Sequence, residues 1–190
     1  MKKYQIIYAD PPWSYNDKLG DRKDLGSATS AYPTQSLEWI KNLQVKNITD
    51  KNCVLFLWAV SPLLPEALEV ITAWGFKYKT LAFCWSKTTS NLKEVANMGR
   101  WTMGNVELCL LATKGSPKRV SRTIRQLVSA ERTRHSAKPT IVRELIVELM
   151  GDLPRLEIFS RPNNQIDIYG KNTFDGWNVW GNEVDSNIEL

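Results

Sequence analysis

The tetrapeptide Asp10-Pro11-Pro12-Trp13 is the stretch whose residue types suggest chemistry most directly. It follows the apolar residues 4–9, which predict a strand, so the Asp10 carboxylate stands at the carboxyl end of that strand. Pro11 favours an extended backbone at Asp10, and two successive prolines fix two φ angles and stiffen the turn. Because open α/β sheets bind ligands at the carboxyl ends of their strands, the sequence predicts a rigid polar pocket here.

Such a pocket suits an exocyclic amine on a flat ring. The Asp10 carboxylate and the Pro11 carbonyl can accept the two N–H bonds of the amine, while the Trp13 indole stacks on the ring. The amino nitrogen of adenine is a weak nucleophile because its lone pair is delocalised. Two acceptors help to localise that lone pair, and Asp10 stabilises the cation that forms when a methyl group arrives. The alternative is a Pro-Pro turn beside a core tryptophan, and four residues alone do not decide between the two.

A second candidate site lies near the C-terminus. Residues 155–160 predict a strand, and Asn182 and Glu183 follow the next strand about 20 residues further on, the spacing at which an acid commonly holds ribose hydroxyls. The glycine fingerprint of dinucleotide sites is missing, so a surface glutamate after a plain strand is an equal alternative.

Composition excludes several classes of protein. The 190 residues, 43% of them hydrophobic, predict one domain over residues 1–190. His135 is the one histidine, so we expect no metal site, and a methyl transfer of the kind above needs no imidazole base. Cys53, Cys84 and Cys109 lie apart in apolar runs and are typical of reduced core residues in a cytoplasmic protein. No apolar run approaches the ~20 residues of a membrane span, so we expect no membrane association.

The elements that must position these residues alternate along the chain. Short apolar strands are expected at residues 4–9, 53–59, 79–86, 106–113, 155–160 and 177–181, and helices at 37–42, 62–74 and 140–150. Strands that are apolar on both faces and separated by helices predict an α/β fold, Rossmann-like, with a mostly parallel sheet covered on both faces. Three polar loops interrupt it, at residues 14–31, 87–105 and 114–134.

The positive charge of the chain is concentrated in the last of these loops. Seven of the 25 Lys and Arg residues and one of the 20 acidic residues lie in 114–134, so this segment carries +6 and the rest −1. A solvated loop is the alternative, but we favour a contact between Arg119, Arg122 and the phosphates of a nucleic acid. Trp101, in the loop 87–105, either contacts nucleic acid as well or is buried under that loop. Trp39, Trp58, Trp74 and Trp85 are expected in the core.

Seven sequence stretches, which occur in the same order as the motifs of a known family, carry a resemblance to that family. They are IIYADPPW (6–13), YPTQSLEWIKNL (32–43), VLFLWA (54–59), GNVELCLLATKG (104–115), HSAKP (135–139), LEIFSR (156–161) and GWNVWGNE (176–183). Together they resemble the adenine-N6 methyltransferases of the DPPW class, which includes the catalytic subunit of the eukaryotic mRNA N6-adenosine methyltransferase and short bacterial and phage enzymes. The resemblance implies an S-adenosylmethionine-dependent methyltransferase fold with permuted motif order and direct in-line methyl transfer.

The resemblance also implies roles for individual residues. The catalytic group is Asp10, Pro11, Pro12 and Trp13. The donor would be held by Asp10, Lys138 at its methionine carboxylate, Glu157, Phe159, Ser160, Arg161, Asn163, Asn164, Asn182 and Glu183. The substrate side would comprise Trp13, Tyr32, Glu107, Arg119 and Arg122. Larger members have an acidic residue upstream of DPPW that helps to bind the adenine of the donor, and Asp167 is a candidate replacement.

Three functions follow as hypotheses. The first is methylation of adenine N6 in DNA, preferred because the chain resembles the short bacterial and phage enzymes. The second is the same reaction on RNA, and the third is a non-catalytic nucleic-acid-binding subunit, against which the intact Asp10 and Lys138 argue. The sequence leaves open whether the protein forms homo-oligomers or hetero-oligomers.

Overall fold

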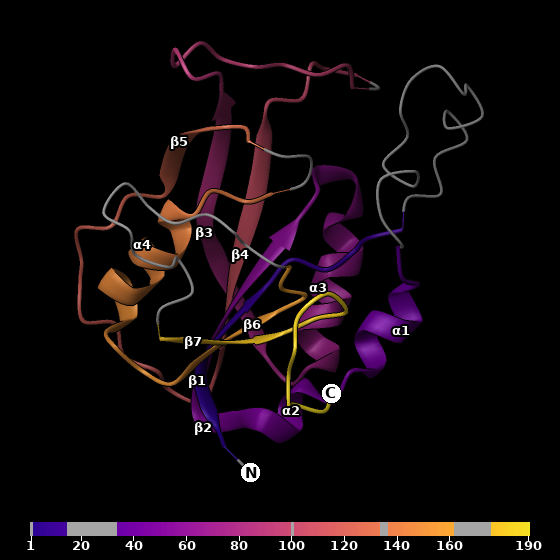
Figure 1. Ribbon diagram of the computed structural model, residues 1–190, viewed down its shortest axis with the longest axis vertical. Helices are drawn as coiled ribbons and strands as arrows, with labels where there is room; N and C mark the ends of the chain where they lie inside the picture. Colours follow the sequence, from indigo (N-terminus) through magenta and orange to yellow (C-terminus); the bar gives the residue numbers. More distant parts are fainter. Residues whose placement is uncertain (1, 15–33, 100, 134–136, 162–175) are drawn as a thin grey trace.

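A mixed sheet forms the centre of the protein in the computed structural model, which describes residues 2–14, 34–99, 101–133, 137–161 and 176–190 (Figure 1). In these residues the strand order is β5-β3-β4-β2-β1-β6-β7. The strands are β1 (Tyr4–Ala9), β2 (Thr49–Ala59), β3 (Lys77–Thr88), β4 (Val106–Lys114), β5 (Leu127–Glu131), β6 (Arg155–Ile158) and β7 (Trp177–Trp180). All neighbouring pairs are parallel except the two that β4 makes with β2 and β3. The mostly parallel α/β sheet is confirmed.

Helices cover both faces of this sheet, as expected. They are α1 (Leu37–Asn42), α2 (Val45–Ile48), η3 (Ser61–Leu63), α3 (Leu64–Ala73) and α4 (Ile141–Met150). Successive side chains of a strand point to opposite faces. Accordingly Ile7 of β1 packs in the core cluster that includes α1 and α3, and Ile6 packs in the cluster that includes α4.

Local signals in the sequence explain where the helices begin and end. The Ser36 hydroxyl accepts a hydrogen bond from the Trp39 N–H at 3.2 Å and caps α1. Gly75 and Gly151 have φ angles of 80° and 87°, which favour glycine, and end α3 and α4. The expected helix at 62–74 differs at its start, because Ser61–Leu63 form a 3₁₀ turn before α3.

The direction of β4 determines what gathers at one edge of the sheet. Because β4 is antiparallel to β2, its first residues lie beside the last residues of β2, with Leu108 opposite Ala59. The start of β4 therefore shares an edge with the carboxyl ends of β1, β2 and β6, where α/β folds place their sites. Of the helices described, none has the length and hydropathy to cross a membrane.

Candidate active site

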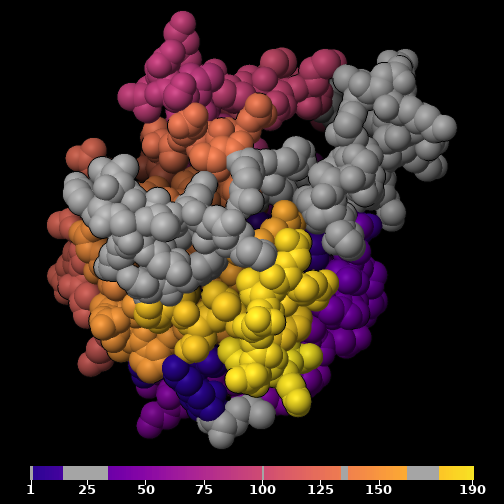
Figure 2. Space-filling view, in the orientation of Figure 1, coloured from indigo at the N-terminus to yellow at the C-terminus, as the bar shows by residue number. Residues whose placement is uncertain are grey.

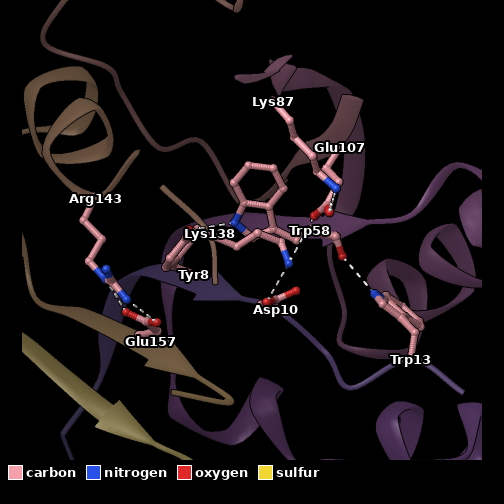
Figure 3. Close-up of polar contacts among 9 residues, drawn as sticks. All are labelled: Tyr8, Asp10, Trp13, Trp58, Lys87, Glu107, Lys138, Arg143 and Glu157. Carbon is pink, nitrogen blue, oxygen red and sulfur yellow. Dashed lines mark hydrogen bonds and ion pairs between the residues drawn. The ribbon is translucent and has the colours of Figure 1, made fainter. Parts of the chain in front are cut away.

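A chain of ion pairs joins Asp10 to residues from three other parts of the fold (Figure 3). Asp10 directly follows β1, Glu107 is near the start of β4, Lys87 is near the end of β3, and Lys138 precedes α4. Lys138 Nζ lies 2.8 Å from Asp10 Oδ2 and 3.2 Å from Glu107 Oε2. Lys87 Nζ lies 2.5 Å from Glu107 Oε1. The structure thus brings together Asp10, Glu107 and Lys138, which the sequence placed in three separate motifs.

Each charged group of this cluster changes the pKa of its neighbours. Burial alone would lower the pKa of Lys138, but Asp10 and Glu107 raise it, so its ammonium stays charged. Burial raises the pKa of Asp10, and Lys138 offsets part of that effect. Burial also acts on Glu107, yet Lys138 and Lys87 together hold its pKa below the usual value. Burial and Glu107 thus favour the protonated form of Asp10, whereas the two lysines favour the ionised form of Glu107.

Replacing Glu107 with glutamine should change the pH dependence of any reaction that needs ionised Asp10. The negative charge of Glu107 raises the pKa of Asp10, so removing it lowers that pKa. The acid limb of kcat/KM against pH is expected to move to lower pH in Glu107→Gln, whatever the change in absolute rate. A limb that stays in place, or moves to higher pH, would contradict this coupling.

Backbone hydrogen bonds hold the loop after β1 in place. The Trp13 N–H donates to the Pro11 carbonyl at 2.8 Å, and the Gln35 N–H donates to the Pro12 carbonyl at 2.9 Å. The Trp13 side chain is 5% exposed, and its indole N–H donates to the Trp58 carbonyl at 3.1 Å. A carbonyl oxygen has two lone pairs, so Pro11 keeps one for a ligand. Stacking of a base on Trp13 stays a prediction, since the described ring is largely covered.

A pocket adjoins this loop on the side of α3. Its volume is about 350 Å³, and Trp13, Gln35, Leu63 and Glu66 are among the residues that line it. That volume is at the lower end of the range for small-molecule sites, ~300–1,000 Å³. The Oε2 atom of Glu66 is buried and has no hydrogen-bond partner among the described residues.

Arg143 is a residue of the site that sequence reasoning missed. Its Nε lies 2.6 Å from Glu157 Oε2 and its Nη2 lies 2.7 Å from Glu157 Oε1, a bidentate pair. Burial raises the pKa of Glu157, and Arg143 counteracts that effect. A sequence signal existed, because Glu157 lies between the apolar residues Leu156 and Ile158 of a buried strand, and a buried carboxylate needs a cation.

Two aromatic rings connect this ion pair to the first. Trp58 Nε1 donates to the Tyr8 hydroxyl at 2.7 Å. Lys138 Nζ lies 5.5 Å from the Trp58 ring centroid, and the Arg143 guanidinium lies 5.8 Å from that of Tyr8, within cation–π range. A single packed layer therefore sets the positions of both Lys138 and Glu157 (Figure 3).

Several of the residues predicted to hold the donor lie at the ends of β6 and β7: Phe159, Ser160, Arg161, Asn182 and Glu183. Phe159 has a φ of 66°, unusual for a residue with a side chain, and its ring packs against Trp39, Trp74 and Trp180. Ser160 follows and is 2% exposed, and its hydroxyl has no partner among the described residues.

A close backbone contact shapes the same place. The Ser160 N–H donates to the Trp180 carbonyl at 2.9 Å. A Cβ atom at Gly181 would lie 2.2 Å from the Ser160 carbonyl oxygen, so only glycine fits. Arg161 and Glu183 face each other at the exposed rim, with Nε and Oε1 4.0 Å apart, and Asn182 beside them is exposed. A buried hydroxyl with no partner among the described residues, in a narrow cradle of backbone, fits a polar ligand such as S-adenosylmethionine.

Lys138 does not have all of its N–H donors available for the carboxylate of the donor. Two of its three N–H donors point to Asp10 and Glu107, which leaves one for a ligand. Its role toward the donor stays a prediction. Tyr32, His135, Asn163, Asn164 and Asp167 lie outside the described residues.

The basic segment 114–134 is not one surface. It contains β5, so the expectation of a continuous loop is wrong at Leu127–Glu131, where Val128 is buried. The Val120 N–H donates to the Leu149 carbonyl at 2.8 Å, which places exposed Arg119 and Arg122 beside the last turn of α4. The ten residues of α4 span about 15 Å, so this point is far from the helix start near Lys138.

Comparisons with known proteins identify the family of the chain. The family model MT-A70 matches residues 4–183. The chain is 36% identical over 206 aligned residues to the Type II methyltransferase M.MunI of Mycoplasma sp., covering 100% of the chain and 82% of that relative. It is 25% identical over 189 residues to the N(6)-adenosine-methyltransferase catalytic subunit METTL3 of Homo sapiens, covering 97% of the chain but 29% of that protein. The resemblance to adenine-N6 methyltransferases is thereby confirmed, and the chain belongs to the MT-A70 family.

Proposed function

We propose that this protein transfers the methyl group of S-adenosylmethionine to the N6 amino group of adenine in DNA. The observation that carries the proposal is the placement of Asp10, which stands on a rigid Pro-Pro turn at the carboxyl edge of the sheet and is held by Lys138 at 2.8 Å. The DNA substrate is supported by the similarity to M.MunI, which extends over 82% of that relative.

The residues of this chain bind and orient the reacting amine. The donor, when bound, supplies an electrophilic methyl group. Asp10 accepts one N–H of the amine, and the free lone pair of the Pro11 carbonyl accepts the other. Lys138 holds the Asp10 carboxylate in one orientation, and Glu107 in turn holds Lys138. The negative charge of Asp10 stabilises the developing cation, and the extra proton then leaves to water.

The cradle at the ends of β6 and β7 would hold the donor. Ser160 offers its unpartnered hydroxyl, and the exposed pair Arg161 and Glu183 stands where ribose and its substituents would lie. Glu157, fixed by Arg143, and Phe159 would form the wall of this cradle.

RNA is the second candidate substrate, because several relatives are named as N(6)-adenosine-methyltransferases. The chain spans about 29% of those relatives, so their activity extends to this chain only as a hypothesis. A non-catalytic nucleic-acid-binding subunit is the third, and the formed Asp10–Lys138–Glu107 cluster argues against it.

Methyl transfer from tritium-labelled S-adenosylmethionine distinguishes these candidates. The wild-type protein would be incubated with plasmid DNA and, separately, with an RNA transcript of the same sequence. We expect label in DNA, and label in RNA alone would replace the proposal with the second candidate. If folded protein labels neither polymer, the non-catalytic nucleic-acid-binding role is the candidate that remains.

The salt dependence of DNA binding tests the two arginines beside α4. Each phosphate contact contributes about 0.9 to the slope of log K against log salt, so Arg119→Ala with Arg122→Ala should lower that slope by about 2. Binding should weaken on all sequences alike, because phosphate contacts carry no sequence information. An unchanged slope in the double variant would show that both side chains face only solvent.

A further inference from the structure

A hairpin between β3 and β4 extends beyond the edge of the sheet and forms a projecting arm (Figure 2). We call residues 97–104 the arm tip. Its base is the bridge between Asn97 and Gly104, whose backbone groups exchange hydrogen bonds of 2.8 Å in both directions. Its apolar side chains are exposed: Met98 is 89%, Trp101 98% and Met103 61% accessible. The alternative of a Trp101 buried under its loop is therefore wrong, and exposure of this much apolar surface indicates a binding role.

The arm belongs to the same edge of the sheet as the proposed active site. The Lys87 N–H donates to the Asn105 carbonyl at 3.0 Å, and Lys87 pairs with Glu107, which contacts Lys138. The arm thus leaves the sheet two residues before Glu107. A polymer whose adenine reached Asp10 would meet this edge of the sheet beside the base of the arm.

We propose that the arm tip enters the groove of a double-stranded nucleic acid and that Trp101, with Met98 and Met103, fills the gap in the base stack left by the target adenine. The proposal rests on the function proposed above, because it assumes that an adenine is taken out of a duplex. Enzymes that modify a base extrude it from the stack, and proteins that bend a duplex insert apolar side chains between its base steps.

Shape and charge favour a nucleic acid over a protein partner. Two antiparallel segments form a ribbon of the kind that fits the major groove of a duplex. The sequence from 95 to 106 has no acidic residue, and its one charged residue is the cation Arg100. A stable protein interface needs about 800 Å² on each partner, more than three side chains on a narrow tip provide.

Methylation of one plasmid in two forms provides the test. Wild type, Trp101→Ala and the control Tyr78→Ala would be compared on intact duplex plasmid and on the same DNA denatured to single strands. Tyr78 is also an exposed aromatic residue, 44% accessible, but it lies at the opposite end of β3. Trp101→Ala should lose about 10- to 100-fold in rate on the duplex and less than about threefold on single strands, where no stack must be opened.

A second readout does not depend on methyl transfer. Permanganate oxidises thymines in a locally opened duplex, and the thymine opposite an extruded adenine has lost its pairing partner. With S-adenosylhomocysteine present, wild type and Tyr78→Ala should produce reactive thymines in the plasmid, and Trp101→Ala should not. Melting temperatures would confirm that all three proteins are folded.

The possible results distinguish the role of the arm in opening the duplex from the methyl-transfer reaction itself. Equal rate losses on duplex and single strands, or no reactive thymine with wild type, would overturn the role of the arm. Loss of self-association in Trp101→Ala by sedimentation, with the duplex rate unchanged, would overturn it too and assign the tip to a protein contact. If wild type methylates nothing, the proposed function fails, while reactive thymines that depend on Trp101 would still support the arm.

Discussion

Replacing Asp10 with asparagine is expected to reduce methyl transfer by about 10²–10³-fold, the usual effect of losing one group that stabilises transition-state charge. The amide has nearly the shape of the carboxylate, so the loop after β1 should keep its geometry. It lacks the negative charge that stabilises the methylated, cationic amine. It also no longer neutralises Lys138, which contacts the carboxylate at 2.8 Å. The initial rate of label transfer to DNA, at saturating donor, is the measurement.

The matched control is Asp152→Asn, which makes the same change at an exposed carboxyl between α4 and β6. Its rate should equal that of wild type. If Asp10→Asn stays within about threefold of wild type, far below the loss expected of a charge-stabilising group, Asp10 does not act on the amine.

Replacing Arg143 with methionine is expected to lower the free energy of unfolding by about 3–5 kcal/mol, because it leaves Glu157 as an uncompensated buried charge. The two side chains are 12% and 10% exposed and form a bidentate pair. Methionine keeps most of the volume of arginine, so the loss reports the charge rather than a cavity. Urea denaturation monitored by tryptophan fluorescence is the measurement.

Two further variants make this prediction specific. Adding Glu157→Gln to Arg143→Met removes the stranded charge and should recover much of the lost stability. Glu38→Gln removes a carboxylate that is 72% exposed from a surface ion pair, and should leave the stability nearly unchanged. A double variant no more stable than Arg143→Met alone would show that the loss has another cause.

Elements with strong local signals were predictable from the sequence. β1 and α1 have the expected bounds, because a mostly apolar run defines the strand and a serine cap begins the helix. β5 was not expected. It is a short edge strand in which Val128 is the buried residue, so its pattern is hidden among basic residues. α2 was missed for a similar reason, since four residues show no helical period.

The motifs that contain the site residues were predictable from the sequence, but the positions of these residues relative to one another were not. Asp10 could be singled out from its neighbours in sequence, and the family resemblance pointed to Glu107 and Lys138. Nothing local shows that Lys138 lies between the two carboxylates. Arg143 has the spacing of an exposed helix residue, and only tertiary packing turns it toward Glu157. The basic segment was expected as one loop, but its residues divide between the chain beside Leu149 at the end of α4 and the strand β5.

The reversal of β4 has a consequence for how such proteins can diverge and be engineered. β3 leaves the sheet and β4 re-enters it at the same edge, so the residues between them can change in number and type while the pairing of Trp85 with Glu107 keeps its register. The arm is thus an insertion whose sequence can change without moving the proposed catalytic residues. Grafting residues 89–105 between family members offers a route to exchanging target preference without redesigning the chemistry.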